Sequence, residues 1–155
     1  DYYFEIIEKV RKVKPDIALS SDFIIGFPGE TDKDFEDTID LIERVKYMNS
    51  YSFKYSPRPG TPAADREEID EEILNERLKI TQDLLNEQQI EYNNQFVKKT
   101  VQVLIDGAGN RTGQIKGKSQ FNQSVALQGE KETIGQIIPV QIKEVLTHSL
   151  LGEKI

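Results

Sequence analysis

A short loop with two glycines lies where an α/β protein could bind a ligand. Gly26-Phe27-Pro28-Gly29-Glu30-Thr31 follows a short apolar segment and precedes a helical pattern of apolar residues. Ligands of α/β sheets bind at the carboxyl ends of strands, and glycines and a helix N-terminus allow close contact with backbone N–H groups. A tight strand–helix turn without a ligand explains the same residues. Glu30, Asp32 and Asp34 disfavour an anion there, because they already complement the helix dipole.

Gly117-Lys118-Ser119 has the ending of a phosphate-binding loop but not its spacing. Such a loop needs four residues between its first glycine and the Gly-Lys-Ser group, and Gly113 leaves only three. The residues that follow, 120–123, do not open an apolar helix. The sequence therefore does not predict a nucleoside triphosphatase.

The two parts of the chain differ in charge. Residues 1–95 carry 12 Lys and Arg against 22 Asp and Glu, whereas residues 96–155 carry 8 against 5. This reversal suggests two modules with different partners. A small barrel with a basic face and an aromatic residue is typical of RNA binding, and ordinary surface lysines are the competing interpretation. The candidate RNA-binding residues of the second part are Lys98, Lys99, Arg111, Lys116, Lys118 and Phe121.

Other chemistry has little support in the sequence. The chain has no cysteine, which excludes a disulfide, a thiolate-bound zinc or iron–sulfur cluster and a Cys nucleophile within these residues. The single histidine, His148, is expected at the surface or at a strand end. The carboxylates lie on expected helix faces rather than in apolar settings that would tune them for acid–base catalysis. No catalytic residue and no metal site is predicted.

The elements of the first part alternate between helix and strand. Apolar spacing predicts helices over 2–14, 32–47 and about 70–95, and buried strands over 22–26 and 51–55. Thr31 is the expected N-cap of the second helix, with Asp34 completing a capping box. The order strand–helix–strand predicts a parallel pair with a right-handed crossover. A proline-rich loop, 56–62, follows the second strand.

The second part reads as an all-β module. Short segments of alternating apolar residues separated by glycines predict five strands, near 100–105, 111–118, 123–128, 134–145 and 150–155. This pattern favours a small closed OB-like barrel, so the expected fold class is α/β followed by all-β. No segment is long and apolar enough for a membrane span, and the N-terminus has no signal-peptide pattern. The expected location is the cytoplasm, with no membrane partner.

Two strings of residues resemble the radical-SAM methylthiotransferase family, and most closely its tRNA-modifying branch. They are Ser21-Asp22-Phe23-Ile24-Ile25-Gly26-Phe27-Pro28-Gly29-Glu30-Thr31 with Phe35, and Ser52-Phe53-Lys54-Tyr55-Ser56-Pro57-Arg58-Pro59-Gly60-Thr61-Pro62-Ala63-Ala64. The part after residue 97 is similar to the TRAM domain of these enzymes. Gly117-Lys118-Ser119, with Asn122 and Val125, is similar to that domain's Gly-Arg-Thr/Ser…Asn…Val segment.

The resemblance implies a domain organisation and an activity. Residues 1–95 would be the C-terminal portion of a TIM-like radical-SAM α/β domain with a connecting helix, and 96–155 a TRAM domain that binds tRNA. Family members add a methylthio group to C2 of N6-dimethylallyladenosine beside the anticodon, using S-adenosylmethionine and two [4Fe–4S] clusters. Because the clusters need cysteines, this chain is expected to be inactive alone and to bind none of these cofactors stably. Its expected partners are tRNA and the rest of the same enzyme.

The resemblance also implies roles for single residues. Gly26, Phe27, Pro28, Gly29 and Glu30 would border the S-adenosylmethionine pocket. Arg58 would lie at the mouth of the active site and contact RNA, and Asn122 would join the basic residues of the barrel in RNA binding. The alternative is a stand-alone TRAM-type RNA-binding module without catalytic activity, and a third possibility is a purely structural domain.

Overall fold

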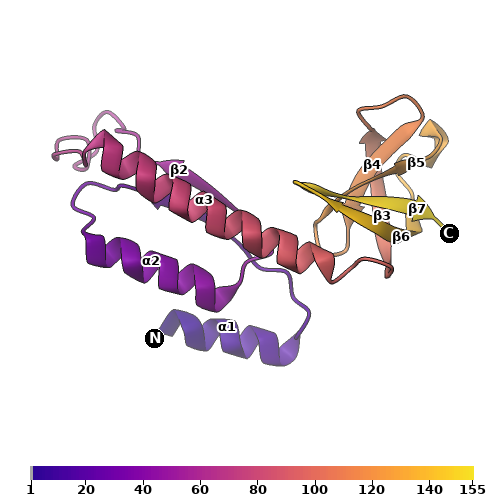
Figure 1. Cartoon of the computed structure of the whole chain (residues 1–155), viewed down its shortest axis with the longest axis horizontal. Coiled ribbons are helices and arrows are strands. Elements are labelled where there is room, and N and C mark those ends of the chain that lie inside the picture. Colours follow the sequence, from indigo (N-terminus) through magenta and orange to yellow (C-terminus); the bar gives the residue numbers. More distant parts are fainter. Residues whose placement is uncertain (1) are drawn as a thin grey trace. The chain divides into compact units, whose positions relative to one another are not determined.

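The computed structural model describes residues 2–155, except the side chain of Glu132. The chain divides into two compact units, residues 1–89 and 90–155 (Figure 1). None of the described helices is both long and apolar enough to cross a membrane.

The N-terminal unit is a two-stranded parallel sheet with helices. Its elements are α1 (Tyr2–Val13), β1 (Ser20–Ile25), α2 (Asp32–Val45), β2 (Asn49–Lys54) and most of α3 (Glu71–Asn94). The strands pair in parallel, from Ser20 opposite Asn49 to Ile25 opposite Lys54, which confirms the predicted parallel pair. Both strands begin two residues earlier than expected.

The ends of α2 explain part of that difference. At its start, the Asp34 N–H donates to Thr31 Oγ1 at 3.2 Å and the Thr31 N–H donates to the Asp34 carboxylate at 2.9 Å, so the predicted capping box is confirmed. At its end, Lys46 adopts a left-handed conformation with φ 52° and stops the helix two residues before the predicted end. The chain therefore turns toward β2 earlier than the apolar spacing indicates.

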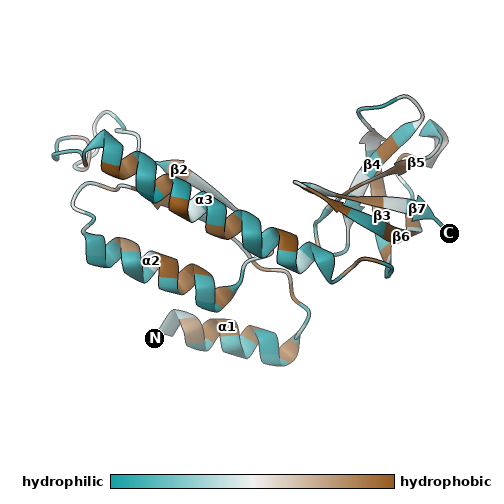
Figure 2. Ribbon diagram, in the orientation of Figure 1, coloured by the Kyte–Doolittle hydropathy of each residue, from teal (hydrophilic) through white to brown (hydrophobic). Residues whose placement is uncertain are grey.

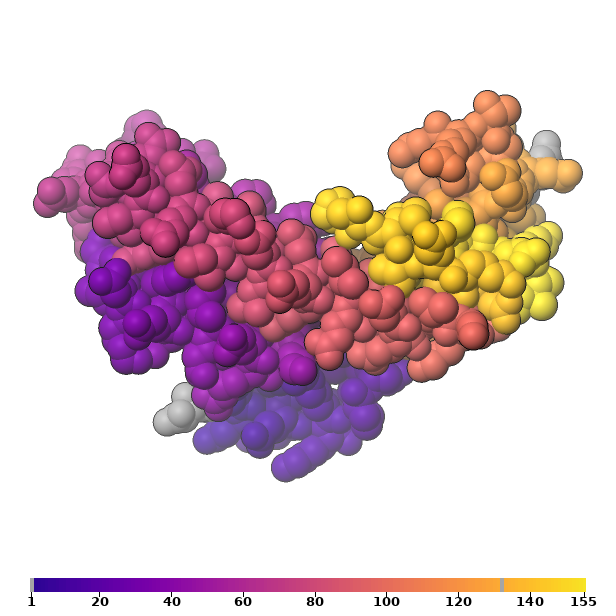
Figure 3. All heavy atoms as spheres, viewed as in Figure 1, coloured from indigo at the N-terminus to yellow at the C-terminus, as the bar shows by residue number. Residues whose placement is uncertain are grey.

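One face of this sheet belongs to a core formed with the helices. A buried cluster joins the three helices and the segment after α2, and Phe23 of β1 packs against it: Ile7 of α1, Ile42 and Val45 of α2, Tyr47 and, from α3, Leu85. Helices α2 and α3 lie side by side and their side chains are in contact (Figure 3). Figure 2 shows both hydrophilic and hydrophobic residues along α3, and three isoleucines of this helix, Ile73, Ile80 and Ile90, are 45%, 43% and 41% exposed.

The other face of the sheet exposes large apolar side chains. Ile24, Tyr51 and Phe53 are 59%, 60% and 54% exposed. Ile24 pairs with Phe53 across the two strands, and the Tyr51 and Phe53 rings stack with centroids 6.5 Å apart. Parallel sheets are normally covered on both faces, so this apolar face is unusual for a finished domain.

The C-terminal unit is the predicted five-stranded closed barrel. Around the barrel the strands are neighbours in the order β3 (Thr100–Ala108), β4 (Gln114–Ser119), β5 (Ser124–Gln128), β7 (Ser149–Lys154) and β6 (Ile137–Leu146). Strands β4 and β6 begin three residues later than expected. Before β4 lies a turn in which the Gln114 N–H donates to the Arg111 carbonyl. Before β6 lies a short 3₁₀ helix, Lys131–Thr133.

The barrel interior is filled by branched aliphatic side chains. Alternate residues of β3, Val101, Val103 and Ile105, point inward and are almost fully buried, as the period of two predicts. Gly117 of β4 lies so close to β3 that a Cβ there would be 2.1 Å from the Leu104 carbonyl oxygen. The first residue of the Gly-Lys-Ser group is therefore required by the approach of two strands.

Candidate functional site

The glycine loop after β1 is closed by its own glutamate. The Gly26 N–H donates to Glu30 Oε2 at 3.0 Å, and the Glu30 N–H donates to the Phe27 carbonyl at 2.8 Å. Gly26 has φ +77°, and a Cβ there would be 2.2 Å from Leu74 Cδ1 of α3. The residue that approaches Gly26 closely is thus a leucine of the same unit.

A buried arginine of α3 holds this loop from the other side. Arg77 donates to Glu30 Oε1 at 2.7 Å and to Asp32 Oδ1 at 2.6 Å, and the Arg77 and Glu30 side chains are only 8% and 12% exposed. Burial acts to lower the pKa of Arg77, but the hydrogen bonds that Arg77 donates to Asp32 and Glu30 outweigh it and raise that pKa above its ordinary value. Sequence reasoning missed Arg77, because nothing separates it from the other charged residues of α3.

These contacts divide the residues predicted to border S-adenosylmethionine into those used within the fold and those that stay exposed. Gly26 and Pro28 are buried, and the Glu30 carboxylate accepts hydrogen bonds from Arg77 and from the Gly26 amide. Phe27 and Gly29 are exposed. An incoming ligand would therefore meet the Phe27 ring and the Gly29 backbone.

The Phe27 ring forms one wall of a pocket with the proline-rich segment. It packs edge-on against Tyr55, with centroids 5.2 Å apart and an angle of 75° between the rings. The pocket has a volume of about 420 Å³, and Arg58 also lines it. The structure thus brings together Phe27 and Arg58, for which the resemblance implies two different ligands.

On the barrel, two of the candidate RNA-binding lysines share a surface. Lys116 and Lys118 point outward from β4, one on each side of Gly117, which faces inward. Lys118 Nζ donates to Ser124 Oγ at 2.8 Å, and Lys118 lies opposite the exposed Leu104 of β3. The two charges therefore add on one face of the barrel.

The other candidates lie in turns and at the end of α3. Arg111 lies in the turn before β4, and the exposed Asn122 lies in the turn between β4 and β5 with φ 61°. Lys98 and Lys99 follow α3, and Lys99 Nζ lies 5.7 Å above the Phe96 ring. Phe121 packs on that same ring, with centroids 4.9 Å apart, and is half-buried. Its ring is therefore partly used within the unit.

A buried polar network fixes the β4–β5 turn. Gln123 Nε2 donates to Asn93 Oδ1 at 2.8 Å, and Ser119 Oγ donates to Gln123 Oε1 at 2.9 Å. Gln123 is 4% exposed and Ser119 6%. The network holds the exposed Asn122 between two anchored residues, a role that the sequence does not indicate.

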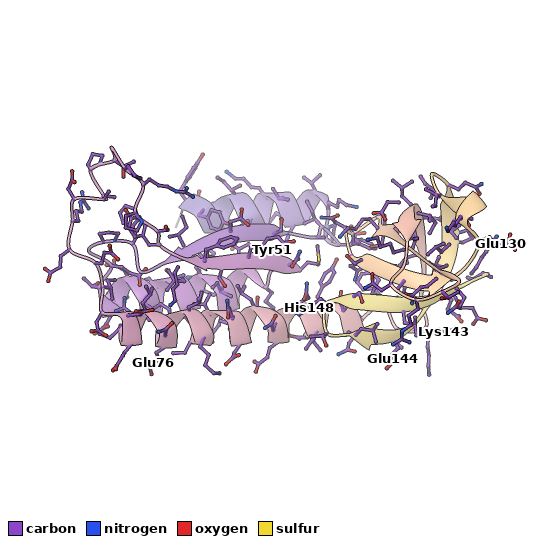
Figure 4. All side chains as sticks on the ribbon, turned by 90° about the horizontal axis from the view of Figure 1, so that it is seen from above. Tyr51, Glu76, Glu130, Lys143, Glu144 and His148 are labelled. Atoms are coloured by element: carbon purple, nitrogen blue, oxygen red, sulfur yellow. The ribbon has the colours of Figure 1, made fainter. Side chains whose placement is uncertain are left out.

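The remaining candidates for chemistry have ordinary positions. His148 is exposed in the turn between β6 and β7, as expected (Figure 4). Lys143 of β6 pairs with Glu153 at 2.9 Å. Among the described residues, no group of three or more His, Cys, Asp or Glu side chains is placed to hold a metal ion.

Comparison with known proteins defines the class of the barrel. Residues 94–155 match the family model of the TRAM domain, so the C-terminal unit is a TRAM domain.

The similarity extends through the N-terminal unit as well. The chain is 54% identical over 155 residues, 99% of its length, to the tRNA-2-methylthio-N(6)-dimethylallyladenosine synthase of Rickettsia akari, and 52% identical over 157 residues to that of Rickettsia felis. The chain spans 35% of the length of each of these relatives and corresponds to their C-terminal part. The resemblance to the tRNA-modifying methylthiotransferases is thereby confirmed.

Proposed function

We propose that this chain is the C-terminal part of a tRNA methylthiotransferase that adds a methylthio group to C2 of N6-dimethylallyladenosine beside the anticodon. The observation that carries the proposal is the identity of 54% over 99% of the chain to a synthase named for this product. A stand-alone RNA-binding module would account for the TRAM domain but not for the similarity of residues 1–93. The enzyme would act on tRNA in the cytoplasm.

Residues 1–95 would be the terminal strand–helix units of a TIM-like radical-SAM barrel, with the connecting helix. The parallel β1–β2 pair and the helix between the strands are the units of which such barrels consist. The exposed face of Ile24, Tyr51 and Phe53 supports the same proposal. In a complete TIM-like barrel this face would point inward, where side chains of the other strands would cover it. The remaining part of the enzyme would supply those strands.

The cofactors would be S-adenosylmethionine and two [4Fe–4S] clusters, which supply the radical chemistry and the sulfur. The cluster ligands would come from the rest of the enzyme, since this chain contains no cysteine. Phe27 and Gly29 would border S-adenosylmethionine with their exposed surfaces. Glu30, with Arg77 and the Gly26 amide, would hold that loop in place. Without the cluster domains, the chain would not catalyse the reaction.

The TRAM domain would bind tRNA through the face of β4. Lys116 and Lys118 would contact phosphates, and Lys98, Lys99, Arg111 and Asn122 would extend the contact surface. Phe121 would contribute through the part of its ring that Phe96 leaves accessible. Phosphate contacts make binding weaken with salt, with a log–log slope of roughly −0.7 for each neutralised phosphate of a single strand.

The experiment compares two charge reversals in the whole chain. One variant carries Lys116→Glu and Lys118→Glu, and the control carries Lys9→Glu and Lys12→Glu, two exposed lysines of α1. The affinity for tRNA is measured over a range of salt concentrations. Losing two phosphate contacts should reduce the magnitude of the slope by about 1.4 in the barrel variant. The control should bind like the parent.

Two results would contradict the tRNA-binding part of the proposal. One is a parent chain without salt-dependent tRNA binding at low ionic strength. The other is an equal loss of affinity in both variants, which would indicate a general charge effect.

A further inference from the structure

The pocket beside Phe27 is built from two loops of the N-terminal unit. One loop follows β1, and the other is the proline-rich segment after β2. The lining is formed by apolar, hydroxyl-bearing and basic side chains, without a carboxylate: Phe27, Tyr55, Arg58, Thr61, Pro62, Ala63 and Arg66. Its volume of about 420 Å³ is in the range of pockets that bind small molecules.

The two arginines of this pocket differ from the other arginines of the unit. Arg11 donates to the Val45 carbonyl, Arg44 pairs with Asp40, and Arg77 pairs with Glu30 and Asp32. Within residues 2–155, no ion pair or side-chain hydrogen bond engages the guanidinium of Arg58 or Arg66. Two unneutralised guanidinium groups at one pocket favour an anion, and their planar donor geometry suits phosphate.

The Tyr55 hydroxyl supplies a second, independent observation. It is buried and has no hydrogen-bond partner among the described residues. A buried polar group without a partner is rare and costs free energy, so a ligand that reaches the Tyr55 hydroxyl from the pocket would supply a hydrogen bond that the fold leaves unmade. The rings of Tyr55 and Phe27, set edge to face, offer apolar surface for a planar ring.

The basic residues are held on a rigid segment. The Thr61 N–H and Oγ1 donate to the Arg58 carbonyl at 3.2 and 2.8 Å, and the Ala64 N–H donates to the Thr61 carbonyl at 3.0 Å. The Arg66 N–H donates to the Ala63 carbonyl at 3.3 Å. Consecutive turns with three prolines in residues 56–62 lower the entropy lost on binding.

We propose that this pocket binds a nucleoside monophosphate unit. Its phosphate would lie between Arg58 and Arg66, and its sugar and base would lie against Phe27 and Tyr55, with a polar group bonded to the Tyr55 hydroxyl. The source of this unit in the cell, a nucleotide of the tRNA, rests on the proposed function. S-Adenosylmethionine, which the proposed function places along the loop of Phe27 and Gly29, is disfavoured between the two arginines, because its net charge is positive and guanidinium groups repel it.

The test titrates the whole chain with small probes and follows the resonances of the pocket by NMR. The probes are adenosine 5′-monophosphate, adenosine, S-adenosylmethionine and the dinucleotide ApA, whose only phosphate is internal. We expect saturable shifts at Phe27, Tyr55 and Ala63 with adenosine 5′-monophosphate, and at least tenfold weaker binding of adenosine. Binding of ApA as tight as that of the monophosphate assigns the site to an RNA strand, and exclusion of ApA assigns it to a free nucleotide.

Matched variants assign the contacts. Arg58→Gln and Arg66→Gln should each raise the Kd for adenosine 5′-monophosphate about tenfold, and Tyr55→Phe about threefold. Arg44→Gln and Tyr51→Phe change the same residue types elsewhere in this unit and should stay within twofold of the parent. Each variant is checked for the parent's chemical shifts away from the pocket, so that unfolding is not mistaken for lost binding.

Three outcomes would overturn the proposal. They are absence of saturable shifts at the pocket, equal binding of adenosine and its monophosphate, and tighter binding of S-adenosylmethionine. Each of them leaves salt-dependent tRNA binding by the barrel untouched, so a failure of the pocket is distinguishable from a failure of the proposed function.

Discussion

The buried pair between Arg77 and Glu30 should be a main determinant of the stability of the N-terminal unit. The perturbation is Arg77→Met, which keeps much of the side-chain volume and removes the charge. The Glu30 carboxylate, 12% exposed, would then keep the Gly26 N–H as its partner but lose its cation. A buried charge without a counter-charge is strongly unfavourable.

The geometry sets the size of the effect. Removing one partner of a buried ion pair costs about 3–5 kcal/mol, and the remaining Gly26 bond places this case near the lower end. The contact with Asp32 adds little, because Asp32 is 93% exposed and exposed pairs contribute roughly 0–1 kcal/mol. A loss of about 3 kcal/mol corresponds to a fall in Tm of about 12 °C or more for a unit of this size.

The assay must report on this unit alone. Urea-dependent hydrogen exchange of the β1 and β2 amides gives its free energy of unfolding separately from that of the barrel. The control is Lys79→Met on the same helix, which breaks only an exposed pair with Asp83 and should cost less than about 1 kcal/mol. Adding Glu30→Gln to Arg77→Met removes the stranded charge and should restore part of the loss. A loss below about 1 kcal/mol for Arg77→Met, or a double variant less stable than the single one, would refute the reasoning.

Two further predictions concern the barrel and the helical core. Gly117→Ala should destabilise the barrel by about 1–3 kcal/mol or more in urea denaturation, because its Cβ would lie 2.1 Å from the Leu104 carbonyl oxygen. The control is Gly107→Ala, where a Cβ would have only a lysine side chain within 4 Å, and it should be nearly neutral in the same measurement. For Tyr47, burial and then the hydrogen bond with Tyr3 raise the pKa well above its ordinary value of 10.0. The stability from the neutral Tyr47 is therefore present below pH 10 and is lost as the pH rises above it, by at most about 1.4 kcal/mol per pH unit. Tyr47→Phe should flatten this fall between pH 10 and 12, and equal slopes in parent and variant would contradict the assignment.

The type and order of the elements could be predicted from local pattern. The alternation of Val101, Val103 and Ile105 indicates a strand with one buried face, and Thr31 with Asp34 indicates the start of a helix. Boundaries were less predictable, because they depend on backbone conformation at single residues. Lys46 ends α2 in a left-handed conformation that no residue type there demands.

The partners of the candidate site residues were not predictable, because they come from distant elements. Glu30 meets Arg77 across 47 residues of sequence, and α3 offers many charged side chains that could have been chosen. The position of Phe121 among lysines suggested that its ring stacks on RNA bases. Its contact with Phe96 depends on how the end of α3 packs against the barrel strands within the C-terminal unit.

The two glycines that suggested ligand binding show what such a motif can and cannot say. A glycine indicates that some group approaches the backbone closely or that φ is positive, and tertiary structure decides which group that is. At Gly26 the group is the Leu74 side chain, and at Gly117 it is the backbone of β3. The recognition proposed for the N-terminal unit therefore depends on side chains whose bonding capacity the fold leaves unused. Arg58, Arg66 and the Tyr55 hydroxyl meet that condition together, and they line one pocket.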